Sequence, residues 1–443
     1  MKNFLILPNQ LFDISYLKKI NITPKDYKII LYEHPHYFTS LNFNKKKLLL
    51  HFSSMLNYKV YLKHHKYQVN YIKYNKKLTI NNYEMFNSAD NLNDIKGIKE
   101  YENPNYLLTN ELREKYMRKT DKYIFNNFYM WSKKELKILE NVKSQDKDNR
   151  NRMPKDTIIP KLEPLSRLDL DLIKLNINRI NKEFNSNYGN TDNFVYPITH
   201  KTAKKFLTSF IKNKFDKFGD YQDFIKKDES FLFHSILSSS INIGLLNPID
   251  IINEIQKYKN KIPLNSYEGF IRQLFWREYQ LYCYKTIDYK KELKTPYLES
   301  KERINKSWYT GNRGIEIIDD TIKKAFDTGY LHHIERLMVM GNYMSLIGLK
   351  PEDGYKWFME FSIDSYDWVM NQNVYDMVFF VTTKTMRKPY VSSSNYLIKM
   401  SDYKKGDWSK EWDKLYEDFQ KRNLDKLWKY RYSFPGLKKY KKI

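Results

Sequence analysis

The strand-forming segments of this chain are short and lie near its amino terminus. They are residues 4–7 (FLIL), 27–32 (YKIILY) and 67–74 (YQVNYIKY). Between the second and the third, residues 45–65 carry apolar side chains at helical spacing. A strand, a helix and a strand of these lengths predict βαβ units, in which helices cover the faces of a parallel sheet. We therefore expect an amino-terminal α/β domain with a Rossmann-like parallel sheet.

Helical patterns replace the strand patterns in the second part of the chain. Helical periodicity, punctuated by Gly and Pro, occurs in residues 169–184, 248–260 and 354–370. A polar and charged run at residues 141–156 predicts a linker or surface loop. We expect three parts, namely an α/β domain (1–130), an interdomain linker (131–185) and a large all-helical domain (186–443).

The chain is strongly basic. Its 443 residues include 77 Lys and Arg against 52 Asp and Glu, which gives a formal net charge of +25. This excess favours a polyanionic partner such as nucleic acid, because Lys and Arg release counterions when they bind phosphates. The alternative is a merely basic surface, which follows from a composition rich in Lys, Asn, Ile and Tyr. Hydrophobic residues make up 41% and aromatic residues 16%, which excludes wholesale disorder.

Cys283 is the only cysteine, so neither an intramolecular disulfide nor an all-cysteine metal site can form. The apolar run at the amino terminus is too short for a signal peptide, and the sequence contains no apolar stretch of membrane-spanning length. We expect a soluble monomer without membrane contact, in the cytoplasm or another reducing intracellular compartment.

The stretch HHIERLMVMGNYMSLIG, residues 332–348, places two imidazoles and a guanidinium on an otherwise apolar helix. His332 and His333 open the stretch, and Arg336 follows one helical turn later. An imidazole can give and take a proton because its ordinary pKa lies near neutrality. The alternative is that these side chains only cap or satisfy a helical core.

Two other stretches combine polar groups with apolar helices. Residues 218–248 place His234 and Ser235 near an apolar helix start, where hydroxyls and free backbone amides suit a phosphate. Residues 268–284 place Arg272 and several aromatic side chains on one helix, which suits a pocket for a base or a flavin. Serine clusters also serve as plain caps, and aromatic stripes as plain core.

Four sequence blocks occur in a fixed order: EGFIRQLFWREY, WYTGNRGIEIIDDTIKKAFDTGYLHHIERLMVMGN, YDWVMNQNVYDM and KPYVSSSNYLIKMSDY. Together they resemble the helical flavin domain of the cryptochrome/photolyase superfamily. The resemblance is closest to the bacterial photolyase-related branch, which includes the iron–sulfur bacterial cryptochromes and the prokaryotic (6-4) photolyases. It runs through residues 1–435 and implies bound FAD and UV-damaged DNA as the partner.

The resemblance also implies roles for the histidine helix. His332 and His333 match the paired histidines of the branch, which serve proton transfer to a pyrimidine (6-4) photoproduct. Arg336 matches the arginine that contacts the flavin and pairs with an acid, for which Asp364 is the candidate. Asp367, one helical turn further, is expected to receive the flavin's ring imide.

Other cofactor contacts are implied in the same way. They are His234, Ser235, Leu237 and Ser238 in the phosphate cradle, Tyr221 and Gln222 in a flavin-contacting loop, Glu268 and Arg272 on the helix that passes the cofactor, and Met370 and Asn373. Met370 stands where the branch carries a glutamate near the flavin's reactive nitrogen, and a thioether cannot exchange a proton.

An aromatic path that delivers electrons to the flavin is implied as well. Trp357 and the pair Trp308 and Tyr309 stand where the branch carries aromatic pairs, although packing alone would also explain them. Phe358, next to Trp357, is a poor redox site.

The branch holds an iron–sulfur cluster with cysteines, but here the corresponding places read GIEIIDD and KKGDWSKEWDK. Cluster iron needs thiolate ligands, so we expect no cluster. Packing around Trp408, Trp412, Tyr416 and Phe419 is expected to hold the carboxy-terminal region instead.

Glu33 stands where an acid that binds an antenna, often a ribolumazine, is expected. His34 and His36 beside it suit an ordinary loop equally well, and no third ligand accompanies them for a metal. The leading functional hypothesis is a light-dependent DNA photolyase for (6-4) lesions. The alternatives are a cryptochrome-like photoreceptor without repair activity, or a DNA-binding protein that has lost its cofactor chemistry.

Overall fold

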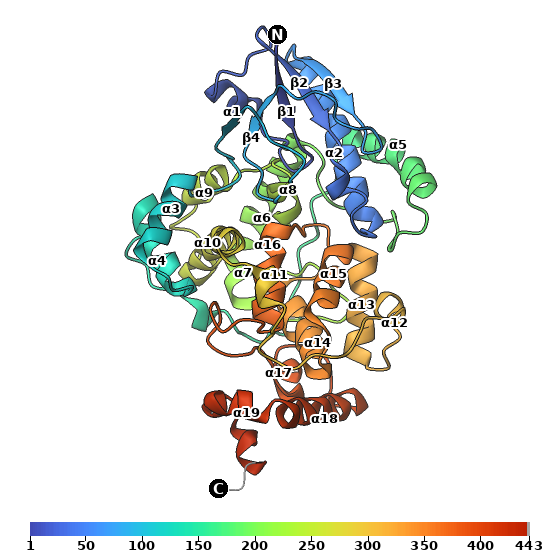
Figure 1. Cartoon of the computed structure of the whole chain (residues 1–443). Coiled ribbons are helices and arrows are strands. Elements are labelled where there is room, and N and C mark those ends of the chain that lie inside the picture. Colours follow the sequence, from blue (N-terminus) through green and yellow to red (C-terminus); the bar gives the residue numbers. More distant parts are fainter. Residues whose placement is uncertain (441–443) are drawn as a thin grey trace.

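The structure is a computed structural model that describes residues 1–440. A five-stranded parallel sheet lies at the amino-terminal end of the molecule (Figure 1). Its strands are β1 (Lys2–Ile6), β2 (Tyr27–Tyr32), β3 (Gln68–Ile72), β4 (Glu84–Phe86) and β5 (Lys99–Tyr101), in the order β3-β2-β1-β4-β5. The three predicted strands and the parallel sheet are confirmed, whereas β4 and β5 were not predicted.

Helix α2 (Lys45–His64) covers the sheet and confirms the predicted helix. It begins where the Asn44 side chain accepts a hydrogen bond from the Lys46 amide, at 2.9 Å. Helix α5 (Arg167–Glu183) packs along α2, so the segment expected as a linker contains a helix that adjoins the α/β part. The expected domain boundaries at 130 and 185 remain predictions.

The rest of the chain is helical, and the structure has no further named strand between Tyr101 and residue 440. The α-helices besides α2 and α5 are α1 (Ile14–Lys19), α3 (Asn110–Lys119), α4 (Phe125–Leu136), α6 (His200–Asn213), α7 (Phe215–Tyr221), α8 (Ser238–Asn242), α9 (Pro248–Gln256), α10 (Leu264–Thr286), α11 (Tyr289–Glu292), α12 (Ser307–Thr310), α13 (Glu316–Thr328), α14 (Asn342–Ile347), α15 (Pro351–Phe361), α16 (Asp367–Asn371), α17 (Ser394–Lys399), α18 (Asp407–Arg422) and α19 (Leu424–Leu427). Within residues 1–440, no helix combines the length and the apolar character that crossing a membrane would need.

Two π-helical segments, η3 (Glu335–Gly341) and η4 (Gln372–Val378), lie against each other in the helical part. Gly341 makes this contact possible, because a Cβ atom there would lie 2.7 Å from Cγ2 of Val378. π-Helical turns are rare and frequently occur at functional sites. The space that η3 and η4 border is therefore a candidate functional site.

One buried hydrophobic cluster joins the sheet to the helical part. Phe4 and Ile29 of the sheet belong to the same cluster as Phe270 and Leu274 of α10. Burial of such side chains stabilises the fold by roughly 25 cal/mol per Å² of apolar surface. The α/β and helical parts are thus fixed relative to each other by a shared core.

The carboxy-terminal segment packs across the far end of the helical part, where α18 contacts α14 (red in Figure 1). Trp408, Trp412 and Phe419 are buried in the second large hydrophobic cluster, and Tyr416 packs against it while half-buried. The Trp412 indole N–H donates a hydrogen bond to the Ser392 carbonyl oxygen at 3.0 Å. The packing expected around these aromatic residues is present.

Candidate functional site

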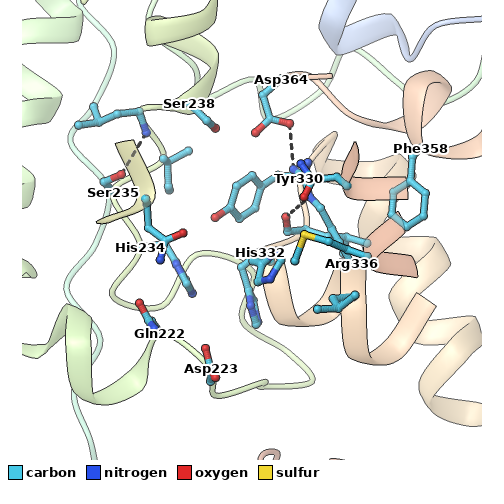
Figure 2. A pocket seen from close by; sticks show the side chains of 18 of the residues that line it. Gln222, Asp223, His234, Ser235, Ser238, Tyr330, His332, Arg336, Phe358 and Asp364 are labelled. Atoms are coloured by element: carbon cyan, nitrogen blue, oxygen red, sulfur yellow. Dashed lines mark hydrogen bonds and ion pairs between the residues drawn. The ribbon is translucent and has the colours of Figure 1, made fainter. Parts of the chain in front are cut away.

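A cavity of about 280 Å³ opens among the helices of the larger part. Several helices and turns form its walls (Figure 2). On one side are the end of α7 with the loop after it, the turn before α8, and α10. The other walls are the helix that begins at His333 and continues into η3, α15, and the segment from Asp364 through η4. The lining residues used below are Phe218, Gln222, Asp223, His234, Ser235, Leu237, Ser238, Tyr330, His332, His333, Arg336, Leu337, Phe358, Asp364, Met370, Asn373, Met377 and Val378.

His332 and His234 stack on one wall of this cavity. Their ring centroids lie 4.7 Å apart at an interplanar angle of 16°. Burial, and then neighbouring positive charge, holds the pKa of each imidazole well below its usual value, so both are neutral at pH 7. Neither ring nitrogen of His332 has a hydrogen-bond partner within residues 1–440, and neither does Nε2 of His234. Buried imidazole nitrogens without protein partners at a cavity wall are available to a ligand or to water.

Glu335 does not satisfy His332. Its Oε2 atom lies 3.6 Å from Nε2 of His332, beyond hydrogen-bond distance, and its Oε1 atom pairs with the Lys324 ammonium at 2.7 Å. The carboxylate instead accepts a hydrogen bond from the His332 backbone amide, at 3.2 Å. Glu335 therefore fixes the start of the helix and leaves the imidazole available to a ligand.

His333 lines the same cavity and is exposed towards it. The surrounding protein, together with the positive charge of Arg336, lowers the pKa of His333 to about 4. The near-neutral pKa expected from the sequence is therefore not found in this environment. His333 is an uncharged imidazole at neutral pH, with one N–H donor and one acceptor nitrogen.

Arg336 and Asp364 form the expected ion pair, with 2.9 Å between Nη2 and Oδ1 (Figure 2). Arg336 also donates through Nε to the Leu331 carbonyl oxygen at 2.6 Å, and Ser362 donates to Asp364 at 2.5 Å. Burial opposes ionisation of Asp364, but Arg336, Ser238 and Ser362 outweigh it and hold the pKa of this carboxyl below its usual value. The cavity thus contains one fixed, neutralised charge pair.

The serine turn before α8 borders the cavity beside His234. Ser235, Leu237 and Ser238 line it, and their role as a phosphate cradle stays a prediction. Ile236 holds a backbone φ of 55°, a left-handed conformation that turns the chain sharply here. The Asn242 amide then donates to the Asp364 carbonyl oxygen at 2.8 Å, so the turn and the Arg336–Asp364 pair are tied together.

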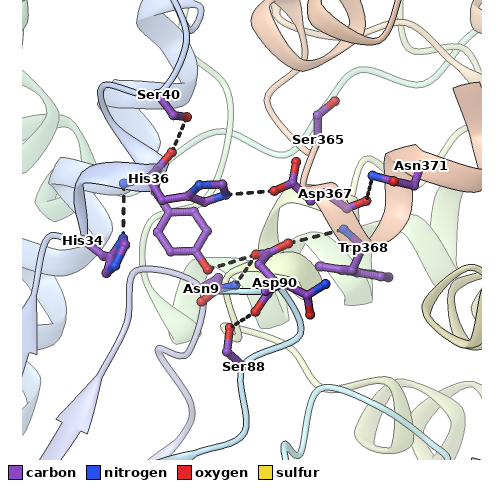
Figure 3. A network of polar contacts seen from close by, with 12 residues as sticks. Asn9, His34, His36, Ser40, Ser88, Asp90, Ser365, Asp367, Trp368 and Asn371 are labelled. Carbon is purple, nitrogen blue, oxygen red and sulfur yellow. Dashed lines mark hydrogen bonds and ion pairs between the residues drawn. The ribbon is translucent and has the colours of Figure 1, made fainter. Parts of the chain in front are cut away.

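Asp367 does not line this cavity, which corrects its expected position. Its carboxylate pairs with Nε2 of His36 at 3.1 Å and accepts a hydrogen bond from Tyr355. Nearby, the Asp90 carboxylate accepts hydrogen bonds from Tyr37 at 2.9 Å and from the Trp368 amide (Figure 3). This polar cluster, called the interface network below, joins the α/β part to the start of α16.

The charges of the interface network are matched inside the protein. Burial disfavours a charge on His36, but Asp367 outweighs it and raises the pKa of His36 above its ordinary value. Burial, and then the Asp367 charge, raises the pKa of Asp90 to about 6. Asp367 is therefore a link between two parts of the molecule.

Glu268, Arg272 and Tyr221 also lie outside the cavity wall. Glu268 accepts a hydrogen bond from Tyr129 at 2.8 Å, and Arg272 pairs with Asp146 at 2.9 Å. Tyr221 packs on Phe233 with 5.5 Å between ring centroids. Glu268, which accepts a hydrogen bond from the Gln145 amide at 3.0 Å, and Arg272 thus hold the segment around residue 146 against α10.

Several lining residues were not predicted as site residues, among them Asp223, Tyr330 and Phe358. Burial raises the pKa of Asp223 to about 7, although the Arg150 guanidinium lies 3.6 Å away. Asp223 follows Gln222 directly, so its place in the same loop was the available sequence signal. The apolar lining residues carry no signal that separates them from ordinary core.

Trp357, Trp308 and Tyr309 are brought together beside the cavity. Trp357 adjoins Phe358, a lining residue, with 5.3 Å between ring centroids. Its indole N–H donates to the Trp308 carbonyl oxygen at 2.7 Å. Both tryptophans are fully buried, whereas Tyr309 is half-buried. The three aromatic side chains therefore run from the cavity towards the surface.

Glu33 lies in a buried ion pair in the α/β part. Its two carboxylate oxygens each lie 2.9 Å from the Arg179 guanidinium, and Tyr71 donates to one of them at 2.7 Å. The Tyr74 amide donates to the other at 3.1 Å. Its two oxygens thus accept four hydrogen bonds within the protein, and the ribolumazine antenna expected at Glu33 stays a prediction. Within residues 1–440, no cluster of His, Cys, Asp and Glu has the make-up of a metal site.

Two family models match the chain. Residues 4–95 and 78–196 match the model described as deoxyribodipyrimidine photo-lyase-related protein. Residues 270–439 match the model described as the FAD binding domain of DNA photolyase. The second match includes the histidine helix, the Arg336–Asp364 pair and η4.

The chain is also similar to individual photolyases and cryptochromes. A (6-4) photolyase of Agrobacterium fabrum is 33% identical over 298 residues, which are 64% of this chain and 58% of that protein. This chain therefore spans less than two thirds of that relative. A class III photolyase structure from Agrobacterium tumefaciens has 11% identity, a TM-score of 0.54 and coverage of 95% of this chain and 98% of its own. A Synechocystis cryptochrome structure has 12% identity, a TM-score of 0.60 and coverage of 90% and 88%. At such identities these structures show a shared fold.

Proposed function

Because this chain belongs to the bacterial photolyase-related branch of the cryptochrome/photolyase superfamily, we propose that it is a DNA photolyase that uses FAD and blue light to reverse UV-induced pyrimidine photoproducts, (6-4) lesions in particular. One observation carries the proposal. His332 and His234, with ring nitrogens that lack partners, line the same cavity as His333 and the Arg336–Asp364 pair. The net charge of +25 supports DNA as the partner of a monomeric protein.

The cavity walls fit a flavin in chemical character. A flavin presents a flat apolar ring system with polar nitrogen and carbonyl edges, and its dinucleotide carries phosphates. Phe358, Leu337 and Met377 supply apolar wall, and the unpartnered imidazole nitrogens of His332 and His234 supply hydrogen-bonding groups. The hydroxyls of Ser235 and Ser238 suit phosphate oxygens, and Asn373 adds a polar contact.

Reduced flavin, when bound and excited by light, supplies the electron that splits a photoproduct flipped out of the duplex. His333 holds a proton at its N–H, within reach of a ligand that enters the cavity. Its pKa rises when a phosphate-bearing strand brings negative charge close to the imidazole, which favours the protonated form needed for proton donation. Arg336, neutralised by Asp364, orients the cofactor without adding net charge. Trp357, Trp308 and Tyr309 supply the route by which electrons reach the cavity from the surface.

The second candidate function is a photoreceptor that keeps flavin and signals without repair. Met370 favours it, because this thioether lines the cavity where an exchangeable proton is expected in the branch. We also propose that the protein carries no iron–sulfur cluster, since Cys283 is its only cysteine and is buried in α10. Neither proposal includes an antenna at Glu33.

The test is the absorption spectrum of the purified protein, followed by repair of a duplex with one (6-4) photoproduct under blue light and in the dark. We expect a yellow protein and light-dependent repair. His333→Ala should bind flavin and the damaged duplex normally but repair roughly 10²–10⁴-fold more slowly, since it loses general acid–base help. His64→Ala, on the exposed end of α2, is the matched control.

Two results would contradict the proposal. A folded protein that stays flavin-free after reconstitution excludes both candidate functions. A flavin-loaded protein that responds to light but repairs neither (6-4) lesions nor cyclobutane dimers favours the photoreceptor. Equal repair by the wild-type protein and His333→Ala would remove the catalytic role of His333 alone.

A further inference from the structure

Tyr309, on α12, donates a hydrogen bond to a buried carboxylate. Its hydroxyl lies 2.7 Å from Oε2 of Glu360, which stands three residues after Trp357 on α15. The Glu360 side chain has no solvent exposure, and its other oxygen accepts a hydrogen bond from the Asn42 amide at 3.2 Å. A phenol on the aromatic path thus has a carboxylate base within proton-transfer distance.

We propose that Tyr309 and Glu360 form a proton-coupled redox pair, in which Glu360 takes the phenolic proton when Tyr309 gives an electron to Trp357, and that Tyr188 is the outlet of this pair to the surface. The inference deepens the proposed function, on which it rests for the flavin that oxidises Trp357. It assigns roles to Glu360 and Tyr188, two residues outside the cavity.

Trp357 and Tyr309 are linked through the backbone of Trp308. The Trp357 indole N–H donates to the Trp308 carbonyl oxygen at 2.7 Å, and this carbonyl belongs to the peptide that joins Trp308 to Tyr309. Phe326 fills the space between the two rings, with centroid distances of 5.9 Å to Trp357 and 5.5 Å to Tyr309. An electron can pass through one hydrogen bond and a short covalent path.

Tyr188 continues the path outward. Its ring stacks on Tyr309 with 3.9 Å between centroids and an interplanar angle of 13°, and it is half-buried. Stacked rings at this separation have overlapping π faces. Tyr188 comes from the loop between α5 and α6, where neighbouring residues such as Ser186 are exposed. An external reductant can therefore reach the path at Tyr188.

The step balances in electrons and protons. An oxidised flavin held in the cavity would supply the oxidant when excited by light and would take one electron from Trp357, and Tyr309 then gives one electron to Trp357. As it does so, the O–H bond of Tyr309 breaks and an O–H bond forms at Oε2 of Glu360. Burial raises the pKa of Glu360 above its ordinary value and outweighs the Lys356 ammonium, which lies 3.9 Å from Oε1, so the carboxylate accepts the proton more readily. A thiol reductant returns the electron through Tyr188, and the proton goes back from Glu360 to the Tyr309 oxygen.

Tyr343 is a second tyrosine beside Trp308, but it has no carboxylate base like Glu360. It also packs against Trp308, with 5.4 Å between ring centroids, but its hydroxyl accepts hydrogen bonds from the Arg313 guanidinium. No carboxylate accepts the Tyr343 proton in the described structure, residues 1–440. Oxidation of Tyr343 would leave its proton beside a positive charge. Tyr343→Phe is therefore the matched control for Tyr309→Phe.

The test places an oxidant beside Tyr188 and needs no flavin. In full-length Ser186→Cys, a thiol-reactive ruthenium bipyridyl label attaches at the new cysteine, because Cys283 is buried. Flash oxidation is followed by electron paramagnetic resonance and transient absorption. We expect a long-lived tyrosyl radical that Tyr309→Phe removes, leaving at most a short-lived one on Tyr188, and that Tyr343→Phe retains. With Glu360→Gln, which keeps an acceptor oxygen but no base, we expect its formation to slow by about a hundredfold.

Two further measurements keep the inference falsifiable if Glu360→Gln does not fold. In the labelled protein with wild-type Glu360, radical formation should slow in D₂O, and it should slow as pH falls through the raised pKa of Glu360. Equal rates with Glu360 and with Gln at this position, or a rate independent of both D₂O and pH, would overturn the pairing. A label-driven radical in a protein that never binds flavin would support the pair while refuting the proposed function.

Discussion

The cavity wall and the interface network both contain buried histidine and aspartate side chains, but they differ in whether these side chains are paired with other protein groups. In the interface network, His36 pairs with Asp367 at 3.1 Å and Asp90 accepts from Tyr37 at 2.9 Å. In the cavity, neither ring nitrogen of His332 has a partner within residues 1–440. The named charged groups of the first cluster are paired with one another, whereas the second keeps imidazole nitrogens available to a ligand. Unpaired buried groups, more than polar residue types, distinguish a site from a structural link.

The two clusters also shift histidine pKa values in opposite directions. Asp367 raises the pKa of His36 against the effect of burial, whereas burial, and then neighbouring positive charge, lowers the pKa of His332 and His234. The difference can be tested by removing matched residues from each cluster.

The largest expected difference comes from breaking one ion pair in each cluster. Arg336→Ala leaves Asp364 as a buried unpaired charge, which should lower the free energy of unfolding by about 3–5 kcal/mol. His36→Ala leaves Asp367 with the Tyr355 hydrogen bond and about a quarter of its side chain exposed (24%), so about 1 kcal/mol is expected. Urea denaturation measures both. Equal losses would mean that the clusters do not differ as described.

Flavin binding should depend on the cavity and not on the interface network. FAD at a hundredfold excess over its Kd should stabilise the wild-type protein by about 2.7 kcal/mol. Asp367→Asn should keep this gain, and Asp364→Asn should lose most of it. Thermal unfolding with and without FAD measures the gain. Loss of flavin in Asp367→Asn would restore the sequence-based assignment of Asp367 as a flavin contact.

The pH dependence of stability should change in opposite senses when one histidine is removed from each cluster. His36 has a raised folded pKa, so its contribution is complete below pH 6.5 and is lost as pH rises through that pKa. His332 has a lowered folded pKa, so the unfolded chain binds more protons below pH 6.5 and stability falls as pH falls there. Each slope is at most about 1.4 kcal/mol per pH unit.

The measurement is the free energy of unfolding of the wild-type protein, His36→Gln and His332→Gln between pH 5 and 8. The wild-type advantage over His36→Gln should shrink above pH 6.5, and its advantage over His332→Gln should shrink below it. Two differences with the same sign of slope would refute the contrast.

The smallest effect, namely none, is expected from iron removal. The carboxy-terminal segment is held by side-chain contacts within the protein, with Trp412 and Phe419 buried and Arg422 donating to the Leu346 carbonyl oxygen at 2.8 Å. Anaerobically purified protein should contain no stoichiometric iron or sulfide, and a chelator should leave the melting temperature unchanged. Iron and sulfide in equal amounts to protein would contradict this.

The sequence predicted the elements whose patterns are long and apolar. The strands around Ile6, Ile29 and Val69 and helix α2 were found where expected. Strands β4 and β5 were missed because each has three residues, and their extended form depends on pairing such as that between Phe4 and Glu84. Pairing between distant segments leaves no local pattern.

The Arg336–Asp364 pair was predicted, but the position of Asp367 was wrong for a local reason. Helical spacing was applied from Asp364 to Asp367, yet α16 begins only at Asp367. Residues 364–366 are an extended turn, so the two carboxylates point to different places. The resemblance identified the segment, while the direction of each side chain depended on where the helix begins.

The π-helical segments η3 and η4 determine how the chain can accept insertions and deletions during evolution. Each π turn holds one residue more than an α turn would, and an α-helix rotates by about 100° per residue. Deleting one residue within Glu335–Gly341 would let the segment close into an ordinary α-helix with little rotation of the residues after it, because the π turn absorbs the extra residue. A single-residue deletion should therefore keep the faces of the helix after it but remove the wide turn at the cavity wall, so its cost should fall on the cavity more than on the fold. Relatives that keep the cavity are expected to keep the length of both segments.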